Sequence, residues 1–403
     1  MAIGGLWIIV GIFTDLAWHV RHDVDTFLTW SHALLYAGLL FTFSVVAIVS
    51  IQNARKYGFS ILRALPVGYE LAVPGVVLFF IAGAADATGH VIWGFEADFN
   101  ALLSPTHQLI GLSIVALLVG PIRSLLCAQE KTVVSFESQL PGIVAVGSLL
   151  GLIHWGLNPF FGTNAEFTYA PLVIHGFSPD ALTLNATLLS LQEAGLASVV
   201  LQTVLTTACV LYMVRALAVR PGGITLALLL GNSFIAVAVA VTWSQAIGAI
   251  VAITIAGFVG DLLLYRAYRT QLQSLSTNAV DETSQTAFAE ADRRLAILLG
   301  PAIPFTYHAV LFAFIVLFLG GTWWNPIFLF GTLLYSAVFG FLLGLVIAAK
   351  PAMVPRAELL HNEIRSLRFS NTGSIAGNNE ERVGVFQQRR KDQYFEVKTK
   401  LAE

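Results

Sequence analysis

Two segments of the chain repeat one pattern of metal-binding residue types. Each copy has an Asp, a His four residues later and a second His further along: Asp15, His19 and His32, then Asp86, His90 and His107. An Asp and a His at this spacing lie one turn apart on the same helix face. Two neutral imidazoles and a carboxylate suit a first-row ion such as copper, zinc or iron, and three protein ligands leave a coordination position open. The repeat predicts two similar metal sites.

A simpler explanation exists for either copy alone. Asp15 and His19 could form a hydrogen-bonded pair at a membrane boundary without any metal. The second copy, at Asp86 and His90, again has a His that opens the next helix, and this repetition favours metal binding.

Three acidic residues between the predicted ligands are candidates for a supporting role. Asp25, Glu96 and Asp98 could accept a hydrogen bond from the second ring nitrogen of a ligand histidine, or they could be solvated acids.

Four further ionisable residues in or beside apolar runs are weaker candidates. His154 and His175 could be a third copy that lacks its Asp, although a hydrogen-bonded role at the membrane interface is favoured. Asp261 lies inside an apolar run and needs a partner, for which His308 is a candidate.

The composition shows what kind of protein must position these residues. Hydrophobic residues make up 56% of the 403 residues, charged residues only 11%, and the mean hydropathy is +0.76. Soluble domains have about 25% charged residues, so this chain has too little polar surface to cover itself in water. The sequence predicts an all-α integral membrane protein whose first partner is membrane lipid.

Ten apolar runs come close to the roughly 20 residues that a helix needs to cross a bilayer. They lie at residues 3–20, 32–52, 69–90, 107–125, 139–157, 186–214, 223–243, 246–266, 297–320 and 325–348. Basic residues gather in alternate connections: Arg55, Lys56, Arg63, Arg123, Lys131, Arg215, Arg220, Arg266, Arg269, Arg293 and Arg294. Basic loops face the cytoplasm. We therefore expect cytoplasmic N and C termini and metal sites near the extracytoplasmic face of the plasma membrane.

The chain divides into five expected regions. They are a membrane region with both ligand blocks (1–138), further membrane helices (139–268), a polar cytoplasmic loop with a possible amphipathic helix (269–296), a C-terminal helix pair (297–349) and a polar cytoplasmic tail (350–403).

Longer motifs surround the two ligand sets. The first block reads Asp15-Leu-Ala-Trp18-His19, then Asp25 and Ser31-His32; the second reads Asp86-x-x-x-His90, Glu96-Ala-Asp98-Phe99 and Ser104-Pro105-Thr106-His107. Over residues 10–125, these blocks resemble the C subunit of the membrane-bound copper monooxygenases, the particulate methane and ammonia monooxygenase family. The resemblance implies copper at one or both sites, with the ligand sets named above. In that family a separate subunit carries the soluble copper domain, which implies that oxygenase activity here would need partner subunits.

The leading hypothesis is therefore a copper-binding membrane subunit of a monooxygenase-like complex, with its own enzymatic role left open. The alternatives are a membrane protein that handles or transports copper or zinc, and a structural subunit whose histidines bond only to one another. The net charge of −2 argues against a nucleic-acid partner. The sequence has no Gly-rich phosphate loop, Cys-x-x-Cys, His-Glu-x-x-His or nucleophile elbow, which excludes the corresponding enzyme classes. The oligomeric state is left open.

Overall fold

The structure is a computed structural model that describes residues 1–19, 29–58, 60–94, 104–129, 135–156, 181–239, 243–277, 282–322, 324, 326–350 and 352. Within these ranges the chain is almost entirely helical and has no strand. The helices are α1 (Ala2–His19), α2 (Trp30–Tyr57), the 3-10 helix η1 (Ile61–Ala64), α3 (Ala72–Trp93), α5 (Pro105–Gln129), α6 (Phe136–Gly156), α9 (Ala181–Arg215), α10 (Gly223–Val239), α11 (Trp243–Thr277), α12 (Glu282–Phe318) and α13 (Pro326–Ala348). The prediction of an all-α fold is confirmed.

Eight of these helices are long and apolar enough to cross a membrane. The apolar parts of the other two, in α1 and α10, are shorter, at Ala2–Asp15 and Gly223–Val237. The helices indicate a multi-pass membrane protein, whereas the count of ten spans and the cytoplasmic termini stay predictions.

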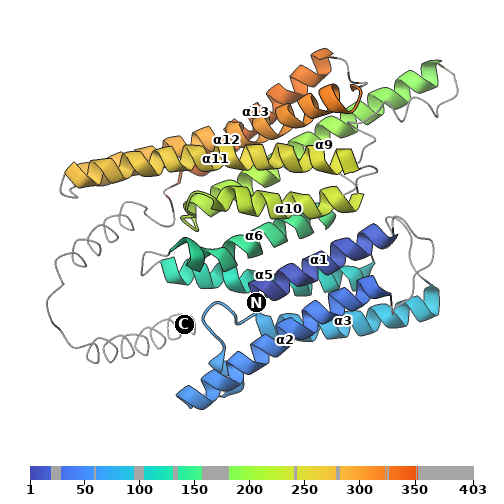
Figure 1. The fold of residues 1–403 in the computed structure, drawn as a ribbon, viewed down its shortest axis with the longest axis vertical. Coiled ribbons are helices and arrows are strands. Elements are labelled where there is room, and N and C mark those ends of the chain that lie inside the picture. Colours follow the sequence, from blue (N-terminus) through green and yellow to red (C-terminus); the bar gives the residue numbers. More distant parts are fainter. Residues whose placement is uncertain are drawn as a thin grey trace.

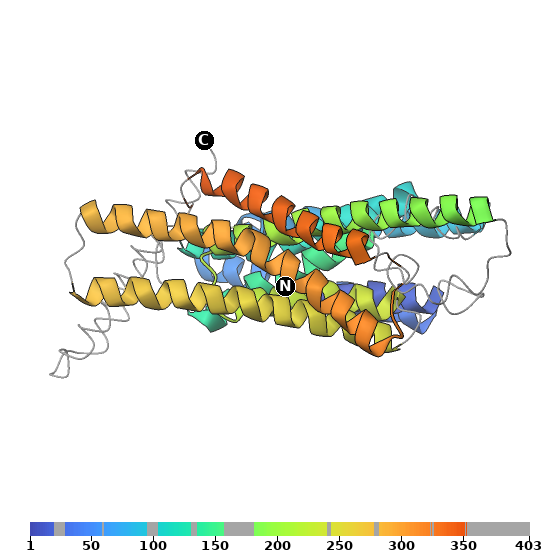
Figure 2. The ribbon, with the colours of Figure 1, turned by 90° about the horizontal axis from the view of Figure 1, so that it is seen from above.

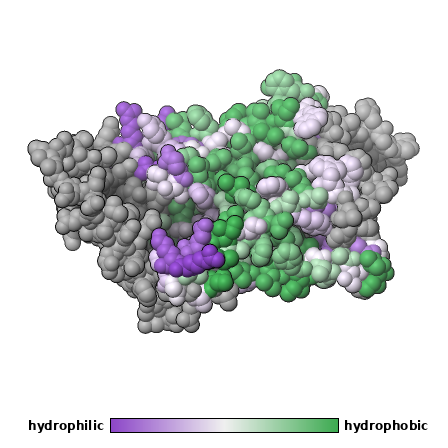
Figure 3. All heavy atoms as spheres, turned by 60° about the horizontal axis from the view of Figure 1, so that its bottom comes forward, coloured by the Kyte–Doolittle hydropathy of each residue, from purple (hydrophilic) through white to green (hydrophobic). Residues whose placement is uncertain are grey.

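The helices lie side by side with broadly parallel axes (Figure 1). One half of the bundle contains α1, α2, α3 and α5, and the other contains α9, α11, α12 and α13, with α6 and α10 between them. Apolar side chains gather across the middle of one face, as the green surface in Figure 3 shows. A helix bundle with an apolar surface suits lipid surroundings, because every backbone group inside a helix is satisfied within its own segment.

Helix α11 and helix α12 extend well beyond the apolar runs. Figure 2 shows them as a long hairpin that projects past the other described helices at one end. Helix structure therefore enters the segment 269–296 from both sides, including the later part where the sequence suggested an amphipathic helix. Gln271 on α11 and Phe288 on α12 are buried, so packing between the two helices continues there.

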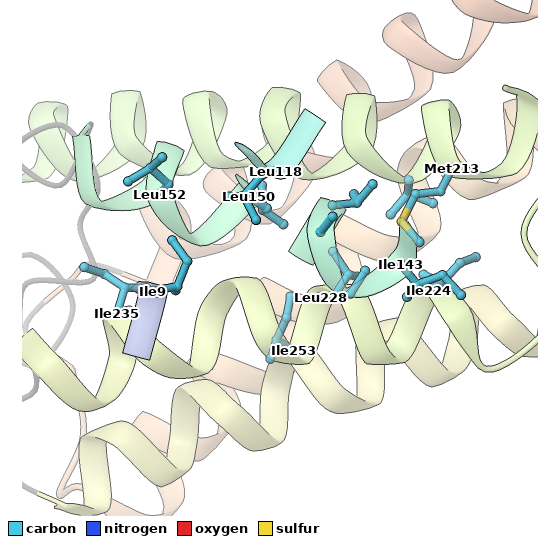
Figure 4. Close-up of a cluster of buried hydrophobic side chains, with 14 of the residues drawn as sticks. Ile9, Leu118, Ile143, Leu150, Leu152, Met213, Ile224, Leu228, Ile235 and Ile253 are labelled. Carbon is cyan, nitrogen blue, oxygen red and sulfur yellow. The ribbon is translucent and has the colours of Figure 1, made fainter. Parts of the chain in front are cut away.

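A cluster of buried aliphatic side chains joins the two halves. Figure 4 shows part of this cluster, with labelled side chains such as Ile9 (α1), Leu118 (α5), Ile143 (α6), Met213 (α9), Leu228 (α10) and Ile253 (α11). Lipid tails are as apolar as these side chains, so close packing rather than water exclusion stabilises such contacts within a bilayer.

Glycine contacts set the register between α1 and α2. A Cβ on Gly11 would lie 2.7 Å from the Cα of Leu35, so the two backbones touch at this point. Asp15 lies one turn after Gly11, and Ser31 one turn before Leu35. Because the helices are antiparallel, the close approach brings Asp15 against the first turn of α2.

Helix α3 packs on α5 in the same manner. A Cβ on Gly75 would lie 3.1 Å from the backbone carbonyl oxygen of Ser113 and 3.4 Å from the Cδ2 atom of Leu117. Asp86 follows Gly75 by eleven residues and Thr106 precedes Leu117 by eleven, which is about three turns in each helix. The end of α3 therefore meets the start of α5, as the end of α1 meets the start of α2.

The contact between α12 and α13 depends on a glycine pair, and its loss should destabilise the bundle. A Cβ on Gly340 would overlap the backbone carbonyl of Gly300, so only glycine allows this approach. We expect Gly340→Leu to separate the helices and to lower the free energy of unfolding by about 1–3 kcal/mol. The measurement is the unfolding midpoint in detergent. The matched control is Gly331→Leu on the same helix, where a Cβ would meet no atom within 4 Å; equal midpoints would contradict the prediction.

Candidate metal centre

Three of the predicted ligands converge where α3 ends and α5 begins. The Nε2 atom of His90 lies 3.3 Å from Oδ2 of Asp86, and Nε2 of His107 lies 3.6 Å from Oδ1. One ligand atom from each residue can be chosen so that all three lie within 4.8 Å of one another. The structure thus brings together the second ligand set as the sequence predicted it.

The distances from Asp86 to the two imidazoles suit a small metal ion. Two ligands at about 2.0–2.1 Å from a tetrahedral ion are about 3.4 Å apart. The distances from Asp86 to the two imidazoles are close to this value. The carboxylate side chain is buried, with 10% of its surface exposed, and the imidazole of His107 is more open at 25%. A ligand set that is buried on one side and open on the other leaves access for an ion and for a further ligand.

The end of α3 determines which nitrogen of His90 faces the site. Gly94 follows the helix with a φ of 83°, a conformation that favours glycine, and its carbonyl lies 3.3 Å from Nδ1 of His90. A carbonyl only accepts hydrogen bonds, so Nδ1 must carry the proton. Nε2 then faces the Asp86 carboxylate, and a cation between the two atoms would make that contact favourable.

Copper binding at this site should therefore be linked to proton release. Metal ligands bind in their deprotonated forms, so copper would compete with protons for the two imidazoles and the carboxylate. We expect the affinity for copper to rise by up to about tenfold per pH unit while one proton is released. Competition titrations between pH 5 and pH 8 measure this slope, and a flat profile would show that no proton is displaced.

The first ligand set repeats this arrangement in part. The Nε2 atom of His32, at the start of α2, lies 3.5 Å from Oδ2 of Asp15, near the end of α1. Trp18 and Trp30 meet edge to face beside it, with ring centroids 5.6 Å apart. The side chain of His19 lies outside the described residues, so this set is described for Asp15 and His32 only.

Both ligand sets lie at the same end of the bundle. Figure 1 shows the ends of α1 and α3 at the right of the view, where α2 also begins. Asp25, Glu96, Asp98 and His175, which the sequence offered as supporting or weaker candidates, lie outside the described residues.

The weaker candidates that the structure describes lie within the bundle and bond to backbone. His154 on α6 is buried, and its Nδ1 atom lies 3.3 Å from the carbonyl of Gly231 on α10. This contact fits the hydrogen-bonded role that the sequence favoured for it. The Nδ1 atom of His308 lies 2.8 Å from the carbonyl of Pro304, within α12.

Asp261 does not pair with His308. Its carboxylate accepts hydrogen bonds from the amides of Ile224 and Thr225, at 3.2 and 2.9 Å, and from the Thr225 hydroxyl at 2.6 Å. It thereby satisfies orphan donors at the start of α10. Helices α11 and α12 are antiparallel, and a Cβ on Gly260 would lie 2.9 Å from Ile303, so the neighbourhood of Asp261 is at least a turn away from His308.

Sequence reasoning assigned no role to two hydroxyl groups that touch the ligand carboxylates. Ser31 donates a 2.6 Å hydrogen bond to Oδ1 of Asp15, and Thr106 donates one of 2.5 Å to Oδ1 of Asp86. The signal was present in the sequence as a repeated pattern of hydroxyl, any residue, hydroxyl and His, at residues 29–32 and 104–107.

No protein-family model matches the chain, and no curated protein or solved structure is significantly similar to it. The likeness to the copper monooxygenase C subunit therefore rests on the two motif blocks alone and stays a prediction.

Proposed function

We propose that this chain is a copper-binding integral membrane protein that serves as a subunit of a monooxygenase-like complex. Such a complex would oxidise a small or apolar substrate with O2. The observation that carries the proposal is the convergence of Asp86, His90 and His107 at the junction of α3 and α5. The repeated contact between Asp15 and His32 supports it.

Copper is the preferred ion because of the donor types. Two imidazoles and one carboxylate form a site of nitrogen and oxygen donors, for which divalent copper has the highest affinity in the first-row series. Zinc accepts the same donors and is the alternative. The buried carboxylate of Asp86 would offset part of the ion's charge, and the bond from His90 to Gly94 would fix the ring that binds it.

The oxygenase part of the proposal depends on the open coordination position and on the surroundings. Copper held by such donors supplies one-electron exchange with O2, for which an external donor and partner subunits would be needed. The residues of this chain would hold the ion, keep one side accessible and surround the site with apolar helices that limit water. By the distribution of basic residues, the sites would face the extracytoplasmic side of the plasma membrane, with both termini in the cytoplasm.

A transport role would need a chain of ligands across the bilayer. Asp261 bonds to the start of α10 instead of pairing with His308, so these two residues do not form a step of such a path. The test below distinguishes the proposed function from copper or zinc handling at one face of the membrane without redox chemistry.

The test is elemental analysis of the protein purified from native membranes, with X-ray absorption at the edge of the metal found. Copper with nitrogen and oxygen ligands is the expected result, together with partner subunits that co-purify and O2-dependent turnover of a small apolar substrate. Zinc in its place would favour metal handling. A folded sample that contains no metal and takes up no added copper would overturn the proposal.

A further inference from the structure

We infer that Ser31 and Thr106 are positioning residues that orient the two ligand carboxylates, each supported by the hydroxyl two residues before it. The inference rests on the proposed metal sites. It gives these hydroxyl groups a role in the sites that the sequence motifs did not indicate. In both helix pairs the hydroxyl group that contacts the carboxylate, from Ser31 or Thr106, lies in the first turn of the second helix. The carboxylate comes from the last turns of the first helix.

Proton counting fixes the direction of the hydrogen bonds at the second site. Thr106 has one hydroxyl proton, and it points to Oδ1 of Asp86 at 2.5 Å. Ser104 lies 2.8 Å from the Thr106 oxygen, so Ser104 must be the donor in that contact. The chain therefore runs from Ser104 to Thr106 to Asp86, and each bond polarises the next one.

The same counting of hydroxyl protons also indicates which nitrogen of His32 is protonated at the first site. Ser31 uses its proton on Oδ1 of Asp15 at 2.6 Å, so Thr29, 3.1 Å from the Ser31 oxygen, donates to Ser31. Thr29 also lies 2.8 Å from Nδ1 of His32, and with its own proton used it must accept there. Nδ1 of His32 is then the protonated nitrogen, and Nε2 is left to face Oδ2 of Asp15 at 3.5 Å.

The position of Thr29 shows that its hydroxyl serves the site rather than the helix. Thr29 is the N-cap residue of α2, a place where a threonine side chain usually bonds to the amides of the first turn. Here the side chain makes no capping hydrogen bond. Its hydroxyl contacts Ser31 and His32 instead.

The hydroxyl groups of Thr106 and Ser31 restrict the orientation of the two ligand carboxylates. With Thr106 bonded to Oδ1, the carboxylate cannot rotate freely, and Oδ2 stays directed at His90. The first site has the same division, with Ser31 on Oδ1 and His32 facing Oδ2 of Asp15. Groups that orient ligands in this way change metal affinity by about 10–100-fold when they are removed.

The experiment compares two substitutions of Thr106 in the full-length protein. Thr106→Val keeps the shape and removes the hydroxyl, and Thr106→Ser keeps the hydroxyl. We expect Thr106→Val to weaken Cu2+ binding by about 10–100-fold and to change the electron paramagnetic resonance spectrum of bound Cu2+, whereas Thr106→Ser restores both. The matched control is Thr88→Val, because the Thr88 hydroxyl donates to the Ala84 carbonyl of its own helix at 2.8 Å.

A second variant covers the case in which Thr106→Val fails to fold. Ser104→Ala removes only the outer hydroxyl of the chain and should give a smaller loss of affinity with the same direction of spectral change. Unchanged affinity and spectrum in the folded Thr106 and Ser104 variants, while Asp86→Asn still loses the ion, would overturn this inference alone. If Asp86→Asn also retains its copper, the proposed metal site itself is wrong.

Discussion

The His90→Ala variant should contain about one metal ion fewer per chain than the unchanged protein after purification from the same membranes. His90 supplies one of three donors, and its Nε2 atom lies 3.3 Å from the Asp86 carboxylate. Two remaining donors, of which His107 is the more exposed, cannot retain an ion through purification. Elemental analysis per mole of protein measures the loss.

Asp86→Asn should have an effect at least as large. Asp86 is the residue that contacts both imidazoles, and the substitution keeps the size of the side chain while it removes the negative charge. His361→Ala, which changes a histidine outside both ligand sets, serves as the control and should leave the metal content unchanged. A full complement of metal in both the His90 and the Asp86 variants would show that the ion, if present, binds elsewhere.

The convergence of Asp86, His90 and His107 was predictable because the decisive distances are short along the chain. Asp86 and His90 share one helix face, and a four-residue spacing is sufficient to place them together. That His107 joins them follows from the antiparallel return of the chain, which the next apolar run predicts. The fold class was predictable for the same reason, because composition alone requires apolar helices.

The hydroxyl chains were harder to predict because their role depends on proton counting in three dimensions. Serine and threonine at a helix start usually cap that helix, so Ser104 and Thr29 had an ordinary explanation. Only the contacts of Thr106 and Ser31 with the carboxylates show a different use.

Arg215 illustrates a residue whose environment the sequence pattern did not reveal. As a cation just after an apolar run, it was grouped with the basic residues of the cytoplasmic connections. In the structure its side chain is 7% exposed and lies between three helices. Loop charge is a local property of the sequence, whereas burial depends on helices that are more than 70 residues further along the chain.

Loss of the Arg215 side chain should therefore be costly for stability. Its Nε atom lies 3.6 Å from Oδ2 of Asp292 on α12, and its guanidinium donates to the carbonyls of Ile347 and Lys350 at the end of α13. Side-chain donors of this kind help to satisfy the carbonyls at and just past the C-terminal end of a helix. Arg215→Met would remove the buried cation that faces the Asp292 carboxylate, and breaking a buried pair in this way costs about 3–5 kcal/mol.

Helix α12, which carries Asp292, also offers a control that separates burial from charge. Arg294 forms an ion pair with Glu290 one turn away, at 3.0 Å, but its side chain is 75% exposed. Water screens such a pair, so Arg294→Met should change the free energy of unfolding by no more than about 1 kcal/mol. Denaturant titrations of both variants in detergent measure the difference. If Arg294→Met were as destabilising as Arg215→Met, the cost would come from the loss of positive charge on this part of the protein and not from the three-helix contact. Arg215→Lys keeps the charge and should fall between Arg215→Met and the unchanged protein, because its single ammonium nitrogen replaces three guanidinium nitrogens that each contact a different acceptor.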